Sequence, residues 1–198
     1  MGVEYELKYR ADSESLNRVR SLFPERKYCE IPMETCYYDT PDGALSRRHW
    51  TLRHRLEWNR HVCTLKTPIA GPGRGEWECE CDDIRKALPI LAEKASLPEL
   101  LDLTAGGVIP TCGARFTREA LPLYIGEVKD NFKIELALDS GVLINGGREC
   151  PFHEIELELK SGDPGKLDLL GEEFAQRFGL VPEPRSKYAR ARALGKEG

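Results

Sequence analysis

The stretch "VEYELKYR" at residues 3–10 alternates apolar and charged side chains with the period of an extended strand. A strand over these residues places Val3, Tyr5, Leu7 and Tyr9 on one face and Glu4, Glu6 and Lys8 on the other. The segment "HEIELELK" at 153–160 repeats this pattern and also ends in a lysine. Neighbouring carboxylates repel one another, so both strands predict that positive charge lies against their acidic faces.

The composition of the chain fits one globular domain, or one domain with a helical appendage. The 198 residues are 40% hydrophobic and 31% charged, and a chain of this length can bury one core. The net charge of −4 argues against a basic nucleic-acid-binding surface, although a local basic pocket is compatible with it. The sequence has no apolar run that could span a bilayer and no signal peptide. We therefore expect a cytoplasmic protein with neither nucleic acid nor membrane as a partner.

The seven cysteines indicate reduced thiols rather than a metal centre. Their number is odd, and no two of them form a CxxC pair. Cys79 and Cys81 fall on the same face of a strand, but no second pair of ligands accompanies them. Buried thiols are therefore favoured over a zinc site.

Short β-rich runs dominate the rest of the chain. They predict strands at 3–10, 33–39, 50–57, 61–67, 76–82, 115–119, 123–129, 132–139, 142–145 and 152–160. The loop "GPGRG" (71–75) is a predicted hairpin connection, and "DSG" (139–141) and "NGG" (145–147) are predicted to close two further hairpins. This succession predicts an antiparallel meander rather than alternating βαβ units.

Fewer segments carry the signals of a helix. A helix over 13–23 is expected after Ser13 as N-cap, and one over 84–94 is expected to be interrupted by Pro89. The clearest helix covers 163–178, between the N-cap Asp163 and Gly179. The tail "RSKYARARAL" (185–194) predicts a basic C-terminal helix near 186–194.

Most of the predicted strands have one apolar and one charged face. An ordinary explanation is a sheet whose charged face meets water. Two observations favour a closed barrel. The charges are segregated into acidic strands and basic strands such as "TLRHR" (51–55), whereas a solvated face usually mixes them. About ten strands also tend to curl and close, which removes the sheet edges. The charged faces would then surround a wet lumen.

A lumen with acidic and basic walls suits a phosphate-bearing guest. Clustered carboxylates bind hard divalent cations such as Mg²⁺ or Mn²⁺, and Arg and Lys bind phosphate oxygens. Metals that bridge carboxylates to phosphates are typical of phosphoryl transfer.

The charged motifs of the chain resemble those of a known family. "EYELK" (4–8) is similar to the ExExK signature of the CYTH superfamily, the triphosphate tunnel metalloenzymes. Further similar motifs follow in the family's order: "YYDTPDGAL" (37–45), "LRHR" (52–55), "TLK" (64–66), "RGEWE" (74–78), "RFTRE" (115–119), "IELALDSG" (134–141), "EIELELKSG" (154–162) and "SKYAR" (186–190). The resemblance is nearest to the CYTH domain of bacterial inorganic triphosphatases. It implies a mainly β (α+β) fold, a closed eight-stranded antiparallel barrel with flanking helices, as a single domain over residues 1–198.

The resemblance also implies roles for the charged residues. The metal ligands, for a two-metal site with Mg²⁺ or Mn²⁺, would be Glu4, Glu6, Asp139, Glu154 and Glu156. The phosphate-binding residues would be Lys8, Arg53, Arg55, Lys66, Arg74, Arg118, Lys160 and Lys187. Lys8 and Glu76 would assist catalysis, and Glu158 would be either a metal ligand or a spacer in the lumen.

Several positions keep a structural alternative. Arg53 and Arg55 can form cross-strand ion pairs with Glu76 and Glu78, and Lys187 and Arg190 can form a solvated helix face. Arg115 and Arg118 have opposite parity on a regular strand, so only one of them can point inward. His54 and His153 have the apolar parity and are expected outside the lumen.

The implied function is metal-dependent hydrolysis of inorganic triphosphate to pyrophosphate and phosphate. The implied partner is inorganic triphosphate or another triphosphate-bearing small molecule. Adenylate cyclases of the CyaB type and thiamine triphosphatases use the same kind of tunnel and remain alternatives. A non-catalytic polyphosphate or nucleotide binder, or a barrel with purely structural ion pairs, is also open. The sequence leaves the oligomeric state undetermined.

Overall fold

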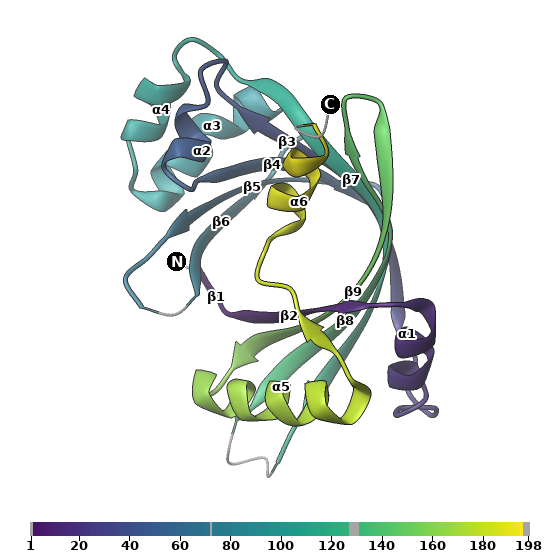
Figure 1. Ribbon diagram of the computed structural model, residues 1–198. Helices are drawn as coiled ribbons and strands as arrows, with labels where there is room; N and C mark the ends of the chain where they lie inside the picture. Colours follow the sequence, from purple (N-terminus) through teal and green to yellow (C-terminus); the bar gives the residue numbers. More distant parts are fainter. Residues whose placement is uncertain (1, 72, 127–130, 196–198) are drawn as a thin grey trace.

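The computed structural model describes residues 2–71, 73–126 and 131–195. The chain forms one strongly curled antiparallel sheet with helices around it (Figure 1). Neighbouring strands follow the order β1-β6-β5-β4-β3-β7-β8-β9-β2-β10. The strands are β1 (Gly2–Glu4), β2 (Glu6–Ala11), β3 (Cys29–Asp39), β4 (Thr51–Glu57), β5 (Arg60–Pro68), β6 (Arg74–Glu80), β7 (Ile109–Tyr124), β8 (Lys133–Asn145), β9 (Arg148–Ser161) and β10 (Val181–Pro182).

The N-terminal segment joins the two ends of this sheet. β1 pairs with β6, with Glu4 opposite Arg74, and β2 pairs with β9, with Glu6 opposite Glu158. Only Tyr5 separates β1 from β2. In the described part of the chain, the circuit therefore has the predicted eight strands when β1 and β2 count as one and the two-residue β10 counts as an edge addition. The predicted fold class is confirmed.

Two groups of helices cover the convex face of the sheet. α2 (Ala44–Arg47), α3 (Ile84–Ala95) and α4 (Glu99–Thr104) accompany a cluster that includes Leu52, Leu65 and Trp77. α1 (Ser13–Arg20) and α5 (Pro164–Phe178) lie over β2, β8 and β9, around Ile155 and Leu157. Burial of this apolar face is the main stabilising contribution to the fold. The charged faces consequently point to the concave side, so the alternative of a half-solvated sheet is wrong.

The last helix, α6 (Lys187–Leu194), lies on the concave side (Figure 1). Its Ala191 packs with Met33, Tyr37, Phe116 and other apolar side chains that point inward from the sheet. Ser186 caps the helix by accepting a hydrogen bond from the backbone N–H of Ala189 at 3.2 Å. The predicted basic helix is confirmed, and the cap brings its first residue toward the lumen.

Two predicted hairpin boundaries are wrong. Residues 139–141 lie inside β8, which runs unbroken from 133 to 145. The strands predicted at 115–119 and 123–129 are one strand, β7, which ends at Tyr124. Residues 127–129, and residue 72 of the predicted "GPGRG" connection, lie outside the described residues. Gly141 allows β8 to approach β7 closely and does not form a turn, because a Cβ at this position would lie 2.5 Å from Cα of Phe116 on β7. The predicted turn after Asn145 is confirmed, with Asn145 opposite Arg148.

The helix boundaries differ from the sequence prediction at three points. α1 is capped by Asp12 rather than Ser13 and ends at Arg20. α3 continues through Pro89, because its apolar side buries Leu88 and Leu91 against the sheet, which offsets the cost of the missing hydrogen bond. α2 and α4 are short helices that the sequence did not predict. α5 begins after Asp163 and ends at Gly179 as predicted.

None of the helices in the described residues is both long and apolar enough to cross a membrane.

Candidate active site

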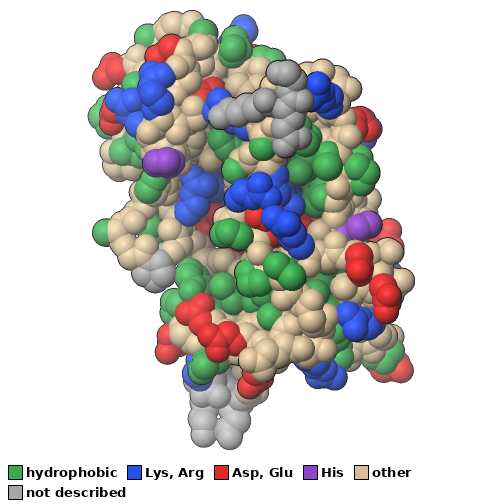
Figure 2. All heavy atoms as spheres, in the orientation of Figure 1, with side chains coloured by type: hydrophobic (Ala, Val, Ile, Leu, Met, Phe, Trp, Pro, Cys, Tyr) green, Lys and Arg blue, Asp and Glu red, His purple; other side chains and the backbone are tan. Residues whose placement is uncertain are grey.

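The concave face of the sheet encloses a cavity of about 570 Å³, which we call the lumen. Its size is typical of small-molecule sites. The acidic residues that line it are Glu4, Glu6, Glu57, Glu76, Glu78, Glu135, Glu156 and Glu158. The basic residues that line it are Lys8, Arg53, Arg55, Lys66, Arg74, Arg118, Lys160, Arg185 and Lys187. Figure 2 shows basic side chains gathered around the opening, with acidic ones behind them.

The lumen brings together all but two of the residues to which the resemblance assigns a metal-binding, phosphate-binding or catalytic role. The exceptions are Asp139 and Glu154, which are fully buried behind the lumen wall. Arg118 points inward, while Arg115 pairs with Glu149 on the outside, as their opposite parity predicted. His54 stacks on His61 on the convex side, and His153 contacts Ser140; neither lines the lumen.

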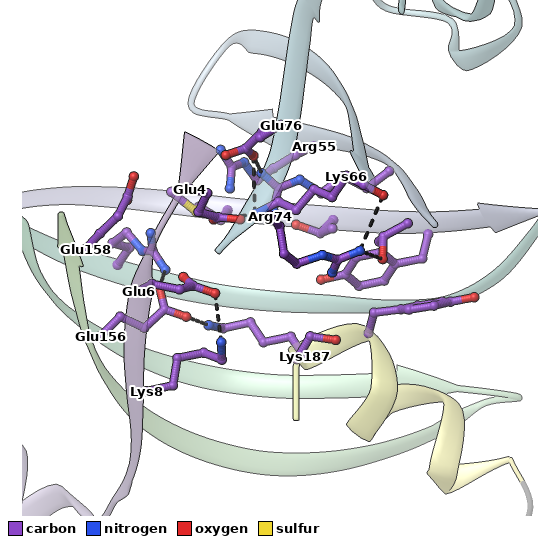
Figure 3. Close-up of a pocket in the computed structure, with 18 of the residues that line it drawn as sticks. Glu4, Glu6, Lys8, Arg55, Lys66, Arg74, Glu76, Glu156, Glu158 and Lys187 are labelled. Carbon is purple, nitrogen blue, oxygen red and sulfur yellow. Dashed lines mark hydrogen bonds and ion pairs between the residues drawn. The ribbon is translucent and has the colours of Figure 1, made fainter. Parts of the chain in front are cut away.

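One wall combines carboxylates of β1 and β6 with cations of β4 and β5 (Figure 3). Lys66 pairs with Glu4, and its Nζ lies 3.2 Å from Oε1 of Glu76. Arg53 approaches the same Glu76 oxygen at 3.3 Å. The cross-strand ion pairs offered as an alternative for Arg53 therefore exist, and the same groups also face the lumen. Glu76 holds two cations in place at once.

Two arginines on this wall have hydrogen-bonding capacity left over. The Nε atoms of Arg53 and Arg55 are buried and have no partner. Burial, together with the neighbouring Arg53 and Arg118, lowers the pKa of Arg55 to about 10, against the opposing pull of Glu57. A buried donor without a partner is costly, and crowded positive charge favours an anion. Both observations point to an anionic ligand between these side chains.

Lys8 on β2 lies on the opposite wall, with its Nζ 2.8 Å from Oε1 of Glu6 (Figure 3). Burial alone would lower the pKa of Lys8, but the carboxylates of Glu6, Glu156 and Glu154 outweigh burial and raise it. Lys8 is therefore an ammonium at neutral pH. A second lysine of the lumen, the half-exposed Lys160 on β9, lies 2.8 Å from Glu158 and 3.7 Å from Glu135.

A buried group of three carboxylates lies behind these residues. The side chains of Asp139, Glu154 and Glu156 each offer an oxygen, all within 4.8 Å of one another. Nζ of Lys187 lies 2.7 Å from an oxygen of Asp139 and of Glu156, and it also contacts Glu154. The ammonium of Lys187 thus takes the position between three oxygens that a metal ion would take.

Two arginines complete the neutralisation of this buried group. Arg118 forms a two-pronged pair with Asp139, with both distances 2.8 Å, and it also contacts Glu156. Arg190 contacts Glu154. The side chains of Lys187 and Arg190 are only 9% and 10% exposed, so the alternative of a solvated helix face is wrong. α6 is fixed to the sheet through buried charge.

The ligand set fits a hard divalent cation. The acidic side chains of the lumen offer only carboxylate oxygens, which Mg²⁺ and Mn²⁺ prefer. Glu6, Glu158 and Glu135 stand directly opposite one another on β2, β9 and β8. Glu4 lies near this row, because it contributes to the raised pKa of Glu158, for which burial is the main cause.

One side of the lumen carries uncharged residues that the sequence pattern does not predict. β3 contributes Ile31, Met33, Thr35 and Tyr37, and β7 contributes Phe116. These residues are uncharged, so the alternation of charged side chains along the strands does not mark them. Glu183 was also missed, although its buried carboxylate binds Arg10 at 2.7 Å and Arg185 at 3.0 Å, which fixes the segment before α6. No periodic pattern marks it, because it lies between elements.

Comparison with known proteins agrees with this architecture. The chain is 33% identical over 161 residues to the inorganic triphosphatase of Haemophilus influenzae, a match that covers 80% of this chain and 45% of that protein. The chain thus spans about half the length of that relative.

Solved structures share the fold. HpAC1 of Hippeastrum, described as having a dominant triphosphatase activity, superposes with a TM-score of 0.66 at 20% identity, over 98% of this chain and 96% of that one. A Pyrococcus horikoshii protein superposes with a TM-score of 0.64 at 24% identity, over 98% and 99% of the two chains. The family model described as the CYTH domain matches residues 2–191. With that match over nearly its whole length, the chain belongs to the CYTH domain family.

Proposed function

We propose that this chain hydrolyses inorganic triphosphate to pyrophosphate and phosphate with the help of Mg²⁺ or Mn²⁺. The observation that carries the proposal is the pairing, within one lumen, of an all-carboxylate ligand set with arginines whose Nε atoms lack partners. The first group suits a divalent cation and the second suits phosphate. The similarity to an inorganic triphosphatase supports the same substrate.

The carboxylates nearest the lumen would hold the metal. We assign this role to Glu4, Glu6 and Glu156, with Asp139 and Glu154 behind them. A bound divalent cation lowers the negative charge of the triphosphate and helps to orient the attacking water. Glu158 and Glu135 extend the same acidic row toward the mouth.

The basic residues would bind and orient the phosphates. Arg53, Arg55 and Arg118 line the lumen together, where burial and the charges of Arg53 and Arg118 lower the pKa of Arg55. Lys66, Arg74 and Lys160 would bind the remaining phosphate oxygens. Lys187 lines the lumen, but its ammonium is held by Asp139, Glu154 and Glu156, so its positive charge would act on the phosphates from behind these carboxylates. In the reaction, water oxygen bonds to a terminal phosphorus, the bond from that phosphorus to its bridging oxygen breaks, and pyrophosphate leaves. Arginine donors placed where this charge develops would lower the barrier.

Lys8 and Glu76 have different parts in this scheme. Lys8 is a cation at neutral pH, because its pKa is raised, so it would stabilise phosphate charge rather than accept a proton. Glu76 orients Arg53 and Lys66. A carboxylate of the lumen would accept the proton of the attacking water.

The test is phosphate release from inorganic triphosphate in Mg²⁺, Mn²⁺ or EDTA, with ATP and thiamine triphosphate in parallel. We expect release from triphosphate that EDTA abolishes. Glu6→Gln should reduce the rate roughly 10- to 100-fold, the usual effect of disturbing a metal site. Glu34→Gln is the matched control, because Glu34 is an exposed residue of β3 that does not line the lumen.

The parallel substrates separate the alternatives. Preference for thiamine triphosphate would replace the substrate but keep the hydrolase. Conversion of ATP to cyclic AMP would indicate a cyclase. Absence of turnover with all three substrates in both metals would overturn the proposed activity and favour a binding module.

A further inference from the structure

A second cavity, of about 640 Å³, adjoins the lumen beside α6. We call it the vestibule. It lies between the region of α2 that leads into β4, the residues Pro68, Ile69 and Gly73 near the ends of β5 and β6, and α6. Thr51, Arg74, Ser186, Tyr188 and Ala189 line both cavities. The vestibule therefore adjoins the place where we propose that triphosphate binds.

The charge of the vestibule differs from that of the lumen. Arg47, His49, Arg74 and Arg192 line it. Within the described residues, no Asp or Glu side chain lines it. The vestibule thus offers positive charge and hydroxyl donors but no carboxylate ligand for a metal. Such a site fits an anion without a metal.

The three arginines keep much of their positive charge available to a ligand. Arg74 donates to the carbonyl oxygens of His49 at 2.8 Å and Lys66 at 3.3 Å, which are neutral acceptors. Arg47 pairs with Asp42, but the side chains are 59% and 67% exposed, so this pair is weak.

Arg192 has a partner whose charge is already shared. It donates to the hydroxyl of Tyr188 at 3.1 Å and lies 3.6 Å from Asp39. The carboxylate of Asp39 accepts backbone N–H groups of Thr40, Leu45 and Ser46 at 2.8, 3.0 and 3.3 Å. Arg192 therefore still presents positive charge to the vestibule.

The lining favours further phosphates over a nucleoside. In the described residues, no Asn, Gln, Asp or Glu lines the vestibule to read the edge of a base. The indole of Trp50 is only 8% exposed. The ring of Tyr188 already packs at 5.1 Å from Tyr37 and under Arg192 at 5.7 Å. A base would therefore find no carboxamide or carboxylate for its edge, and the rings of Trp50 and Tyr188 are already packed.

We propose that the vestibule binds the fourth and later phosphates of linear inorganic polyphosphate while the end of the chain occupies the lumen. This inference rests on the proposed function, because it takes the lumen as the site of the terminal phosphates. The vestibule itself needs no metal, so its contribution to affinity persists in EDTA. The site would make the protein bind longer polyphosphates more tightly than triphosphate.

Calorimetric titration with short-chain linear polyphosphate and with triphosphate, each in EDTA and in Mg²⁺, tests this proposal. We expect wild type to bind polyphosphate more tightly than triphosphate. Arg47→Gln/Arg192→Gln should weaken polyphosphate binding roughly tenfold, as expected for the loss of charge-assisted hydrogen bonds. Its affinity for triphosphate and its rate of triphosphate hydrolysis should stay within about twofold of wild type.

The matched control is Arg60→Gln/Arg115→Gln. Arg60 and Arg115 are each 59% exposed, like Arg47, and each pairs with a surface glutamate away from the vestibule. Equal weakening of polyphosphate binding in both double variants would show general charge attraction and overturn the proposal. Equal affinity of wild type for polyphosphate and triphosphate would overturn it as well.

An ATP titration distinguishes the remaining outcomes. If the loss in Arg47→Gln/Arg192→Gln affects ATP and not polyphosphate, the occupant is a nucleotide and the proposal is wrong. Failure of the proposed function has a different signature, namely no phosphate release from triphosphate by wild type. In that case the affinities would still report whether the vestibule selects longer chains.

Discussion

Lys187 is the residue on which three buried carboxylates converge. Its ammonium contacts Asp139, Glu154 and Glu156, of which the first two are fully buried. These carboxylates raise the pKa of Lys187 even though burial opposes them. The side chain therefore connects α6 to β8 and β9 as a permanent cation. A metal ion and this ammonium would compete for the same three oxygens.

Lys187→Met should lower the free energy of unfolding by about 3–5 kcal/mol, because it leaves buried carboxylates without their partner. Urea denaturation in EDTA measures this loss. Added Mg²⁺ should restore more stability to the variant than to wild type, since the three oxygens become available to it. Lys86→Met, at a side chain 71% exposed, should change stability by less than about 0.5 kcal/mol. A variant as stable as wild type in EDTA would contradict the role of Lys187.

Glu183 gives the fold a dependence on pH. Hydrogen bonds from Arg185, against the effect of burial, and from Arg10 lower its pKa from 4.5 to about 2. A lowered carboxyl pKa stabilises the folded state above the unfolded pKa of 4.5, and this contribution disappears as the pH falls toward about 2.

Glu183→Gln should therefore cost about 1 kcal/mol at pH 7, a modest value because both arginines are more than half exposed. The difference in unfolding free energy between wild type and the variant should narrow from pH 4.5 downward. Parallel denaturation curves across this range measure it. A difference that stays constant down to pH 2.5 would show that the carboxylate charge contributes nothing.

At the scale of single residues, the sequence predicted the charged lumen well and its neutral wall poorly. Parity along the strands placed Arg53, Lys66 and Glu156 correctly on the inner face. The same reasoning had no signal for Tyr37 or Phe116, because an apolar side chain on the inner face looks like a core residue. The pairing of Lys187 with three carboxylates was also out of reach, since it depends on where α6 docks.

Among the elements, β8 shows how local turn signals can mislead. The sequence "DSG" has turn chemistry, yet in the structure Gly141 lets β8 pass close to β7. A Cβ at this position would overlap the carbonyl oxygen of Arg115 and lie 2.5 Å from Cα of Phe116. The backbone of β7 cannot move away easily, because β3 holds it on the other side.

Gly141→Ala should consequently destabilise the protein by about 3 kcal/mol or more, at the upper end of the range for overpacking. Gly106→Ala is the control, because a Cβ there meets no atom within 4 Å. Thermal unfolding of the two variants measures the difference. Equal melting temperatures would show that the sheet can separate at this point without penalty.

The predicted element boundaries were wrong where packing decides them. Alternation predicted where strands exist, and the Asp163 cap and Gly179 stop predicted α5. Neither signal reveals that α3 tolerates Pro89, because that tolerance comes from the sheet beneath it. The short helices α2 and α4 have too few residues to show a period.

At the scale of the whole molecule, charge is concentrated in the interior of the curled sheet. The eight acidic and nine basic side chains that line the lumen within the described residues are nearly balanced in number. In a ligand that combines an anion with a divalent cation, the anion would pair with the basic side chains and the cation with the acidic ones. Its binding should therefore stabilise the closed circuit of strands more than either ion alone.

Triphosphate with Mg²⁺, at about 100 times the dissociation constant, should add about 2.7 kcal/mol of stability, which corresponds to roughly 5–10 °C in melting temperature for a domain of this size. Triphosphate alone and Mg²⁺ alone should each give a smaller shift. Sodium sulfate at equal ionic strength is the control. If sulfate matches the complete ligand, the charges of the lumen serve structural ion pairing only.

The pairing of the N-terminal strand β2 with the late strand β9 has a consequence for how the chain folds. The segment that holds β1 and β2 is synthesised early, but its partner β9 covers residues 148–161. Contact order is therefore high at the seam of the barrel, and folding of such topologies is slow, on the order of milliseconds to seconds. Until β9 emerges from the ribosome, the acidic N-terminal strand lacks the neighbour that completes the circuit.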